Sequence, residues 1–248
     1  MSPERKEKTG RIDPARRGIK AAVLLAVIIF GLILFLESDF FNLRNIIIEG
    51  CQIVTRSEIM ALSGLGESQS ILSVVPRAVC DGLAKDPRIR SAVVERQLPN
   101  TVTIRIQERI PLYRLPMDHG WAVVSSDGYI IYSIFEEDRT IPVLSGIPIQ
   151  TWRLGQKIDE PLLLAAGDFL NNATPGLLCV IVRVDVQKPE QIYMELASGV
   201  ILELGNTESV RRKMEAAAII LSDNEQKNRA LQTINVRSPE NPVVKLAE

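Results

Sequence analysis

Ile89–Glu108, with the sequence IRSAVVERQLPNTVTIRIQE, contains two segments of alternating apolar and polar residues on either side of one turn-forming tetrad. The tetrad is Leu98-Pro99-Asn100-Thr101, and proline and asparagine favour turns, so the pattern predicts a β-hairpin with strands over 89–96 and 102–108. Ala92 and Val94 share one face of the first strand. On the second strand, one face is predicted to carry Val102, Ile104 and Ile106 into a core, and the other to turn Thr103, Arg105 and Gln107 to water.

The residues before this hairpin predict one more strand and two helices. The β-branched run NIIIE at 45–49 is typical of a strand, and Gly50 ends it. Thr55 and Glu58 have the spacing of a capping box, which predicts a helix over 55–62. A second helix is predicted over about 73–84, with one face that carries Val75, Val79 and Leu83. The order β-α-α-β-β indicates a compact domain in which two helices cover one face of a three-stranded sheet.

Farther upstream, Gly18–Leu36 reads GIKAAVLLAVIIFGLILFL and is apolar without interruption from Ala21 onward. At about 1.5 Å per residue, a helix of this length spans the roughly 30 Å of a hydrocarbon core when Lys20 reaches the headgroups, so we predict a single transmembrane helix. A cleavable secretory signal is the weaker alternative, because Glu-Ser-Asp follows the run without a small-x-small cleavage site. A buried helix of a soluble domain is weaker still, since the run supplies neither caps nor polar residues.

The charges on the two sides of this run predict its orientation. Glu37 and Asp39 follow it, whereas the residues before it include the cations Arg5, Lys6, Lys8, Arg11, Arg16, Arg17 and Lys20. The positive-inside rule therefore predicts a cytoplasmic N-terminus and an extracytoplasmic main body. The tail 1–17 is charged and poor in apolar residues, and is predicted to be disordered.

Composition excludes several classes of function. The chain has 248 residues, 46% hydrophobic residues and a net charge of −1, so it can build proper cores and has no global field that attracts nucleic acid. One histidine, His119, and three cysteines lack the spacing of metal ligands, and neither a metal nor a cofactor is expected. Cys51, Cys80 and Cys179 are interpreted as buried free thiols, with a Cys51–Cys80 disulfide as the alternative in an oxidising compartment.

The region after Pro111 predicts an antiparallel sheet with two helices. Strands are expected over 121–124, 129–132, 141–144, 180–187, 192–196 and 200–204. Asp159 is predicted to cap a helix over 161–171 that buries Leu162, Ala166, Phe169 and Leu170. A second helix over 207–221 is predicted to bury Val210, Met214, Ala217 and Leu221, and to leave Arg211, Arg212 and Lys213 solvated. Two closing strands are expected over 233–237 and 243–245.

Two phrases, RIRSAVVERQLPNT at 88–101 and ERIP at 108–111, together with the order β-α-α-β-β, resemble a POTRA domain. The motif residues are Ala92, Val94, Pro99, Glu108, Arg109 and Pro111. With the anchor, the arrangement resembles the bacterial cell-division family FtsQ/DivIB over about 18–245, although Leu98 stands where that family usually has an aromatic residue. The fold class is thus predicted as α+β, with a cytoplasmic tail (1–17), a transmembrane helix (18–36), a POTRA-like domain (40–111) and an FtsQ-type β domain (112–248).

The last strand is predicted to lie at an edge of the second sheet, where unpaired amides and carbonyls are open to a partner strand. The resemblance implies the same place, because in the FtsQ family the C-terminal strands receive the coiled-coil protein FtsB, which travels with FtsL. The residues predicted to bind the partner are Ile234, Asn235, Val236, Arg237, Ser238, Val243, Val244 and Lys245. The alternative is that these residues only complete the fold.

Two functions follow from these observations. The preferred one, implied by the resemblance, is a non-catalytic scaffold that is anchored in the bacterial inner membrane and binds other division proteins at the septum. The alternative is a membrane-tethered enzyme of the cell envelope with carboxylates that the sequence does not single out, for example in the run Glu136-Glu137-Asp138. Nucleophile, zinc and nucleotide motifs are absent from the sequence, and His119 is interpreted as a solvated loop residue.

Overall fold

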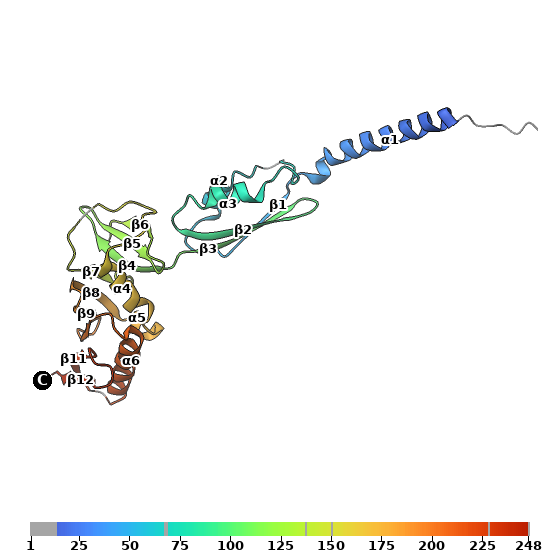
Figure 1. Ribbon diagram of the computed structural model, residues 1–248. Coiled ribbons are helices and arrows are strands. Elements are labelled where there is room, and N and C mark those ends of the chain that lie inside the picture. The colour runs from blue at the N-terminus through green and yellow to red at the C-terminus, as the bar shows by residue number, and fades with distance from the viewer. Residues whose placement is uncertain (1–13, 67–68, 137, 150, 228, 248) are drawn as a thin grey trace, which may run out of the picture.

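The computed structural model describes residues 14–66, 69–136, 138–149, 151–227 and 229–247, which form an N-terminal helix and two sheets (Figure 1). Helix α1 (Pro14–Leu36) leaves one end of the first sheet, and the second sheet lies at the other end (Figure 1). Residues 14–17, predicted as part of a disordered tail, are helical, and residues 1–13 of that tail lie outside the described residues. Among the residues that the structure describes, no helix has both the length and the apolar character that a membrane crossing requires.

The first sheet has the predicted β-α-α-β-β order. A 3-10 helix, η1 (Asp39–Phe41), leads into this unit, whose elements are β1 (Asn45–Glu49), α2 (Arg56–Ser63), α3 (Pro76–Leu83), β2 (Ile89–Gln97) and β3 (Thr101–Glu108). The strand order is β1-β3-β2, with β1 parallel and β2 antiparallel to the central β3. The capping box is confirmed, since the Thr55 hydroxyl accepts from the Glu58 amide and the Glu58 carboxylate accepts from the Thr55 amide.

The core of the first sheet agrees with the predicted faces except at two positions. Val94 and the three inward residues of β3 are buried under the helices. Thr103, predicted to face water, is only 3% exposed, because it lies on the central strand between Ile47 of β1 and Glu95 of β2. Val75 is 59% exposed, because α3 begins at Pro76 rather than at about residue 73, and Val75 is its N-cap rather than part of its buried face.

The second sheet has nine strands in the order β12-β11-β10-β9-β8-β7-β4-β5-β6. The pairs β4–β7, β7–β8 and β10–β11 are parallel, so the prediction of an antiparallel sheet was wrong. Parallel neighbours need a crossover connection, and helices lie in the connections from β7 to β8 and from β10 to β11. The strands are β4 (Pro111–Pro116), β5 (Trp121–Ser125), β6 (Ile130–Ile134), β7 (Val143–Ser145), β8 (Ile181–Lys188), β9 (Gln191–Leu196), β10 (Ile201–Gly205), β11 (Leu231–Asn235) and β12 (Val243–Leu246).

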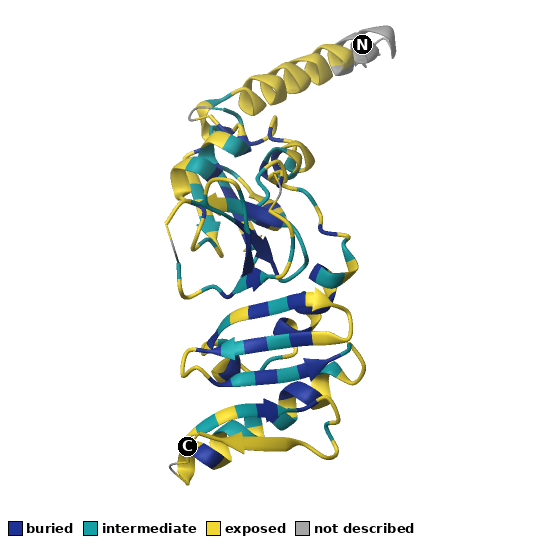
Figure 2. Ribbon diagram, turned by 90° about the vertical axis from the view of Figure 1, so that its left-hand side faces the viewer, coloured by how far each residue is buried: buried dark blue, intermediate teal, exposed yellow. Residues whose placement is uncertain are grey.

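In the described part of the second domain, three helices accompany this sheet, one more than the sequence predicted: α4 (Pro161–Asn171), α5 (Pro175–Leu178) and α6 (Val210–Gln226). The four-residue α5 is too short to show a helical period. Helix α4 has the predicted bounds, but its N-cap is Glu160 rather than Asp159. Its core face includes Leu163, which is 2% exposed, while Leu162 is only half-buried. Figure 2 shows the resulting alternation of buried and exposed residues along the strands of this sheet.

Lys213 of α6 is 1% exposed, so the prediction that it is solvated was wrong. Its ammonium group turns back to the loop before the helix and donates to the backbone and side-chain oxygens of Asn206, at 2.7 and 2.9 Å. Burial lowers the pKa of Lys213. A long side chain in the first turn can thus satisfy its charge within the fold, which periodicity alone does not reveal.

The remaining sequence predictions concern reactive side chains. All three cysteines are free thiols, with Cys51 and Cys80 half-buried and Cys179 exposed rather than buried. His119 is exposed, in the loop between β4 and β5. Glu137 of the acidic run lies outside the described residues.

Candidate partner-binding edge and first-domain motif

Strand β12 is the outermost strand at one edge of the nine-stranded sheet, and all four of its residues are exposed. Among the described strands it pairs only with β11, in antiparallel register, with Val243 opposite Asn235 and Val244 opposite Ile234. The apolar side chains of Val243, Val244 and Leu246 are 66%, 37% and 49% exposed. An apolar strand with one free side is the geometry that a partner strand can extend.

The direction of the free amides follows from one hydrogen bond. The Ala247 amide donates to the Ala230 carbonyl at 3.0 Å, so it points toward β11. The register between β11 and β12 shifts because β11 contains one extra residue, whereas β12 has none. The direction of the backbone amides therefore alternates regularly along β12. The amides of Val243 and Lys245 therefore point toward β11, and those of Val244 and Leu246 point away from the sheet.

Strand β11 lies inside the sheet, between β12 and β10. The predicted contact residues at its end and in the connection after it separate into two groups. Ile234 and Val236 are 0% exposed and belong to the core, so they complete the fold and cannot touch a partner directly. Arg237 and Ser238 are exposed in the connection between the two strands. Leu246 was missed by the sequence prediction, although the apolar alternation from Val244 continues to it.

Polar contacts fix the backbone next to the edge. Asn235 donates from its side-chain amide to Glu203 of β10 at 2.7 Å, and accepts from the Arg237 amide at 3.1 Å. The Arg237 guanidinium donates to the Tyr193 hydroxyl at 3.0 Å and lies 3.6 Å from the Glu203 carboxylate. These contacts tie the chain leading into β12 to β9 and β10, so the edge is presented on an ordered support.

The first-domain motif holds together the end of the domain that faces the second sheet. The Glu108 carboxylate accepts hydrogen bonds from three consecutive backbone amides, those of Gln52, Ile53 and Val54, at 2.7 to 3.0 Å. It therefore fixes the loop between β1 and α2. Of the other motif residues, Ala92 and Val94 lie on β2, Pro99 lies in the hairpin turn, and Pro111 begins β4.

Arg109 joins the two domains. Its Nη1 donates to the carbonyls of Pro87 and Ile89 in the first domain, at 2.7 and 2.8 Å. Its Nε donates to Asp127 of the second domain at 3.0 Å, and its guanidinium lies 4.2 Å from the ring centroid of Tyr129. Burial tends to raise the pKa of Asp127, but hydrogen bonds from Ser125 and Arg109 outweigh it and hold that pKa below its ordinary value.

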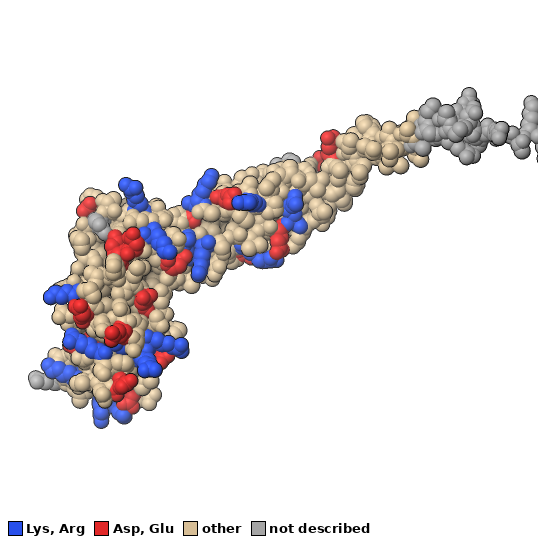
Figure 3. Space-filling model, in the orientation of Figure 1, with Lys and Arg blue, Asp and Glu red and all other residues tan. Residues whose placement is uncertain are grey.

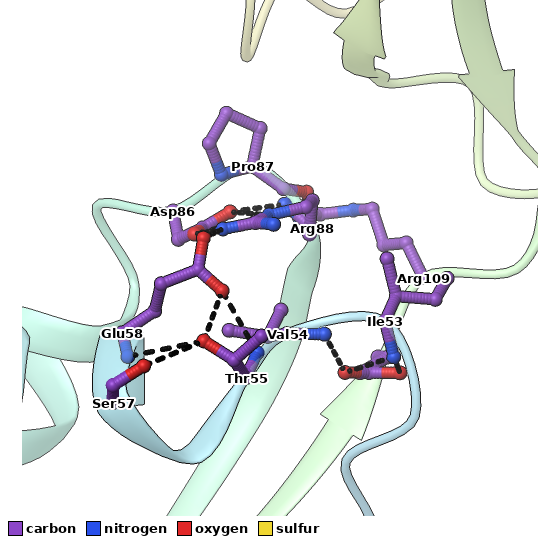
Figure 4. Close-up of polar contacts among 10 residues, drawn as sticks. Ile53, Val54, Thr55, Ser57, Glu58, Asp86, Pro87, Arg88 and Arg109 are labelled. Atoms are coloured by element: carbon purple, nitrogen blue, oxygen red, sulfur yellow. Dashed lines mark hydrogen bonds and ion pairs between the residues drawn. The ribbon is translucent and has the colours of Figure 1, made fainter. Parts of the chain in front are cut away.

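A second charged network lies beside this joint (Figure 4). The Arg88 guanidinium contacts Glu58 at 2.7 Å and Asp86 at 2.6 Å. The hydrogen bond from Arg88, with those from Thr55, lowers the pKa of Glu58 to about 2. Burial tends to raise the pKa of Asp86, but the hydrogen bonds from Arg88 bring it below its ordinary value. These carboxylates stay ionised at neutral pH and connect the capping box to the turn before β2.

Within the described residues, no group of three or more histidine, cysteine or acidic side chains could hold a metal ion. The carboxyl groups of the described part whose pKa departs clearly from its ordinary value are Glu58, Asp86, Asp127 and Asp138, and each is shifted downward. A general acid needs a raised pKa, so these four groups are suited to structural ion pairs and turns.

Comparison with known proteins agrees with this architecture. Residues 41–109 match the family model described as "POTRA domain, FtsQ-type". The chain is 28% identical over 233 residues to cell division protein FtsQ of Mycobacterium leprae, which covers 92% of this chain and 64% of the relative. It is 29% identical to FtsQ of Mycobacterium tuberculosis, over 92% of this chain and 70% of the relative. It is 22% identical to cell division protein DivIB of Clostridium botulinum, over 94% and 93%.

The first sheet and its motif therefore define a protein with an FtsQ-type POTRA domain. The relatives extend beyond that domain into the second sheet, and the chain belongs to the FtsQ/DivIB family of cell-division proteins.

Proposed function

We propose that this chain is a non-catalytic scaffold of the bacterial division machinery, anchored in the cytoplasmic membrane, that binds other membrane-anchored division proteins at the septum. Residues before 18 lie in the cytoplasm, residues 18–36 cross the membrane, and the domains 40–111 and 112–248 lie outside it. The observation that carries the proposal is the exposed edge of β12, with outward amides at Val244 and Leu246 and apolar side chains beside them.

The membrane anchor is supported by the surface of α1. Its large apolar side chains from Val23 to Leu36 are between 41% and 63% exposed, so the described fold leaves about half of their surface uncovered, and Phe35 near the end of the helix packs against Phe40 and Phe41. In Figure 3, the part of α1 that is not grey shows a mostly tan surface, without blue or red side chains along most of its visible face. Burying such a surface in lipid removes it from water, and the cations before it favour a cytoplasmic N-terminus.

The partner at β12 is proposed to be an FtsB-like coiled-coil protein together with an FtsL-like one. Val244 lies opposite the buried Ile234 and therefore shares the core face of the sheet. A partner strand that pairs with the outward amides would place its own alternate side chains over this face, next to Leu246. Backbone pairing would supply affinity and the apolar contacts specificity.

Val244→Pro tests this mode of binding, because it removes an outward amide and leaves the β11–β12 hydrogen bonds intact. Val244→Ala is the matched control, since it shortens the side chain and keeps the amide. We expect the detergent-solubilised full chain with Val244→Pro to capture much less of a tagged FtsB/FtsL-like pair, and Val244→Ala to capture more than the proline variant. Equal capture by the wild type and Val244→Pro, at an unchanged melting temperature, would place the partner elsewhere.

A further inference from the structure

The end of the first domain from which α1 leaves is built from three segments that lie far apart in sequence. The loop before α3 pairs with the end of η1 and the residues that follow it. The Ile71 amide donates to the Phe41 carbonyl and the Leu43 amide to the Gln69 carbonyl, both at 2.8 Å. The hairpin turn reaches the same place, because the Asn100 carbonyl accepts from the Arg44 amide at 3.0 Å. Figure 1 shows the β2–β3 turn and this loop close to the base of α1.

Each of the three segments exposes a large apolar side chain at this end. Phe40, Leu72, Val75 and Leu98 are 52%, 41%, 59% and 65% exposed. Their neighbours Phe41, Ile71 and Val74 are buried, so the backbone directs one residue into the core and the adjacent one outward. Apolar groups gathered next to the exposed apolar surface of α1 continue that surface onto the folded domain.

Cations accompany these apolar side chains. Arg44, Arg77 and Arg96 are exposed at the same end of the domain. Arg96 donates to the Val74 carbonyl at 3.2 Å, which places its guanidinium beside Val75. Arg77 lies in the first turn of α3, two residues after Val75, and the Arg44 amide binds the hairpin turn. Apolar side chains flanked by arginines are the composition that binds the headgroup region of a bilayer containing anionic lipid.

The joint between α1 and the domain is packed. Glu37 and Ser38 alone separate α1 from η1, and Ser38 accepts from the Phe40 amide as the cap of η1. The ring centroid of Phe35 in α1 lies 5.9 Å from that of Phe40 and 5.3 Å from that of Phe41. Phe41 is itself part of the domain core. Aromatic pairs at these distances stabilise one arrangement. The end of the domain therefore stays next to the point where α1 would leave the membrane.

We infer that this junction collar, formed by Phe40, Leu72, Val75 and Leu98 with Arg44, Arg77 and Arg96, binds the extracytoplasmic surface of the same membrane. The inference rests on the proposed membrane anchor. The apolar side chains enter the headgroup region and the arginines pair with lipid phosphates. The contact holds the first domain against the bilayer, which fixes the direction in which the second domain and its β12 edge extend.

Tryptophan reporters in the full chain test the collar. The chain is reconstituted in two sets of vesicles of phosphatidylethanolamine and phosphatidylglycerol at three to one, one with bromine atoms near the headgroups for the collar and one with bromine atoms deep in the acyl chains for α1. Each variant is compared with the parent chain. Leu72→Trp and Leu98→Trp report on the collar, and Phe30→Trp reports on α1. The matched control is Phe135→Trp in the second domain, because the Phe135 side chain is 81% exposed. The two native tryptophans are present in every variant and provide a constant background.

We expect the added emission of Leu72→Trp and Leu98→Trp to shift to the blue and lose intensity, while that of Phe135→Trp does neither. Changing the three collar arginines to glutamine should lower the equilibrium constant between the docked and the undocked collar about 5-fold per cation removed, because each cation contributes about 1 kcal/mol near an anionic surface. Quenching of Phe30→Trp without quenching at the collar would overturn the collar and leave the anchor standing. An unquenched Phe30→Trp would overturn both. Collar quenching that appears only at high protein density would assign the surface to a second copy of the chain and also overturn the inference.

Discussion

Replacing Arg109 by methionine removes the guanidinium, which joins the two domains and lies over the Tyr129 ring, and keeps an unbranched apolar side chain at this position. The lost contacts are two hydrogen bonds to backbone carbonyls, those of Pro87 and Ile89, the ion pair with Asp127, and the cation–π contact with Tyr129. Hydrogen bonds to a charged group each contribute about 1.5–3 kcal/mol, but these carbonyls regain water in the variant and Asp127 is 23% exposed. We therefore expect the free energy of unfolding to fall by about 3 kcal/mol, which is less than the separate contributions would give.

The tryptophans make the assay domain-specific, because Trp121 and Trp152 both belong to the second domain. Urea titration followed by fluorescence reports on that domain, and circular dichroism reports on both. Arg90→Met is the matched control, since Arg90 is 53% exposed and approaches Asp127 only to 4.0 Å, and we expect it to cost less than about 0.5 kcal/mol. A value for Arg109→Met equal to that of Arg90→Met would refute the reasoning.

The same pair gives a pH dependence with a defined sign. The pKa of Asp127 is lower in the folded state than in the unfolded chain, so its ion pair stabilises the fold above pH of about 4 and loses that effect as the pH falls through the folded-state value. The difference in stability between wild type and Arg109→Met should therefore shrink from pH 7 to about pH 3. A difference that stays constant over this range would assign the stabilisation to the carbonyl contacts alone.

Three further predictions concern the core, a turn and the topology. Ile104→Asp places a carboxylate at a site that is 0% exposed, at a cost of several kcal/mol, so circular dichroism should lose the cooperative transition of the first domain; a wild-type curve would contradict this. Gly50→Ala should lower the melting temperature more than Gly64→Ala, because both have positive φ but only the Cβ at position 50 collides with the Ile106 carbonyl; equal shifts would refute the clash. Alkaline phosphatase fused after Glu248 should be active in a bacterial host, and an inactive fusion would reverse the proposed orientation.

The sequence by itself determined the elements whose signals lie within a few consecutive residues. The Ile89–Glu108 hairpin, the capping box of Thr55 and Glu58, and the Met214–Ala217 stripe of α6 were all predicted before the fold was known. Periodicity and caps depend on neighbours one strand pair or one helical turn away, so the local sequence carries them in full. The same logic gave the membrane anchor as a prediction from hydropathy and charge.

Tertiary structure alone decided the features that depend on residues far apart in the chain. Thr103 is buried because two other strands flank it, and Lys213 is buried because a preceding loop supplies oxygen atoms for its charge. The parallel pairing of β10 with β11 depends on the crossover through α6, and the ion pair of Arg109 with Asp127 depends on how the domains meet. At the candidate site, sequence order placed β12 last in the chain, but only the packed sheet made Ile234 core and left Val244 at a free edge. Burial and edge position are properties of the assembled layers, and no local pattern encodes them.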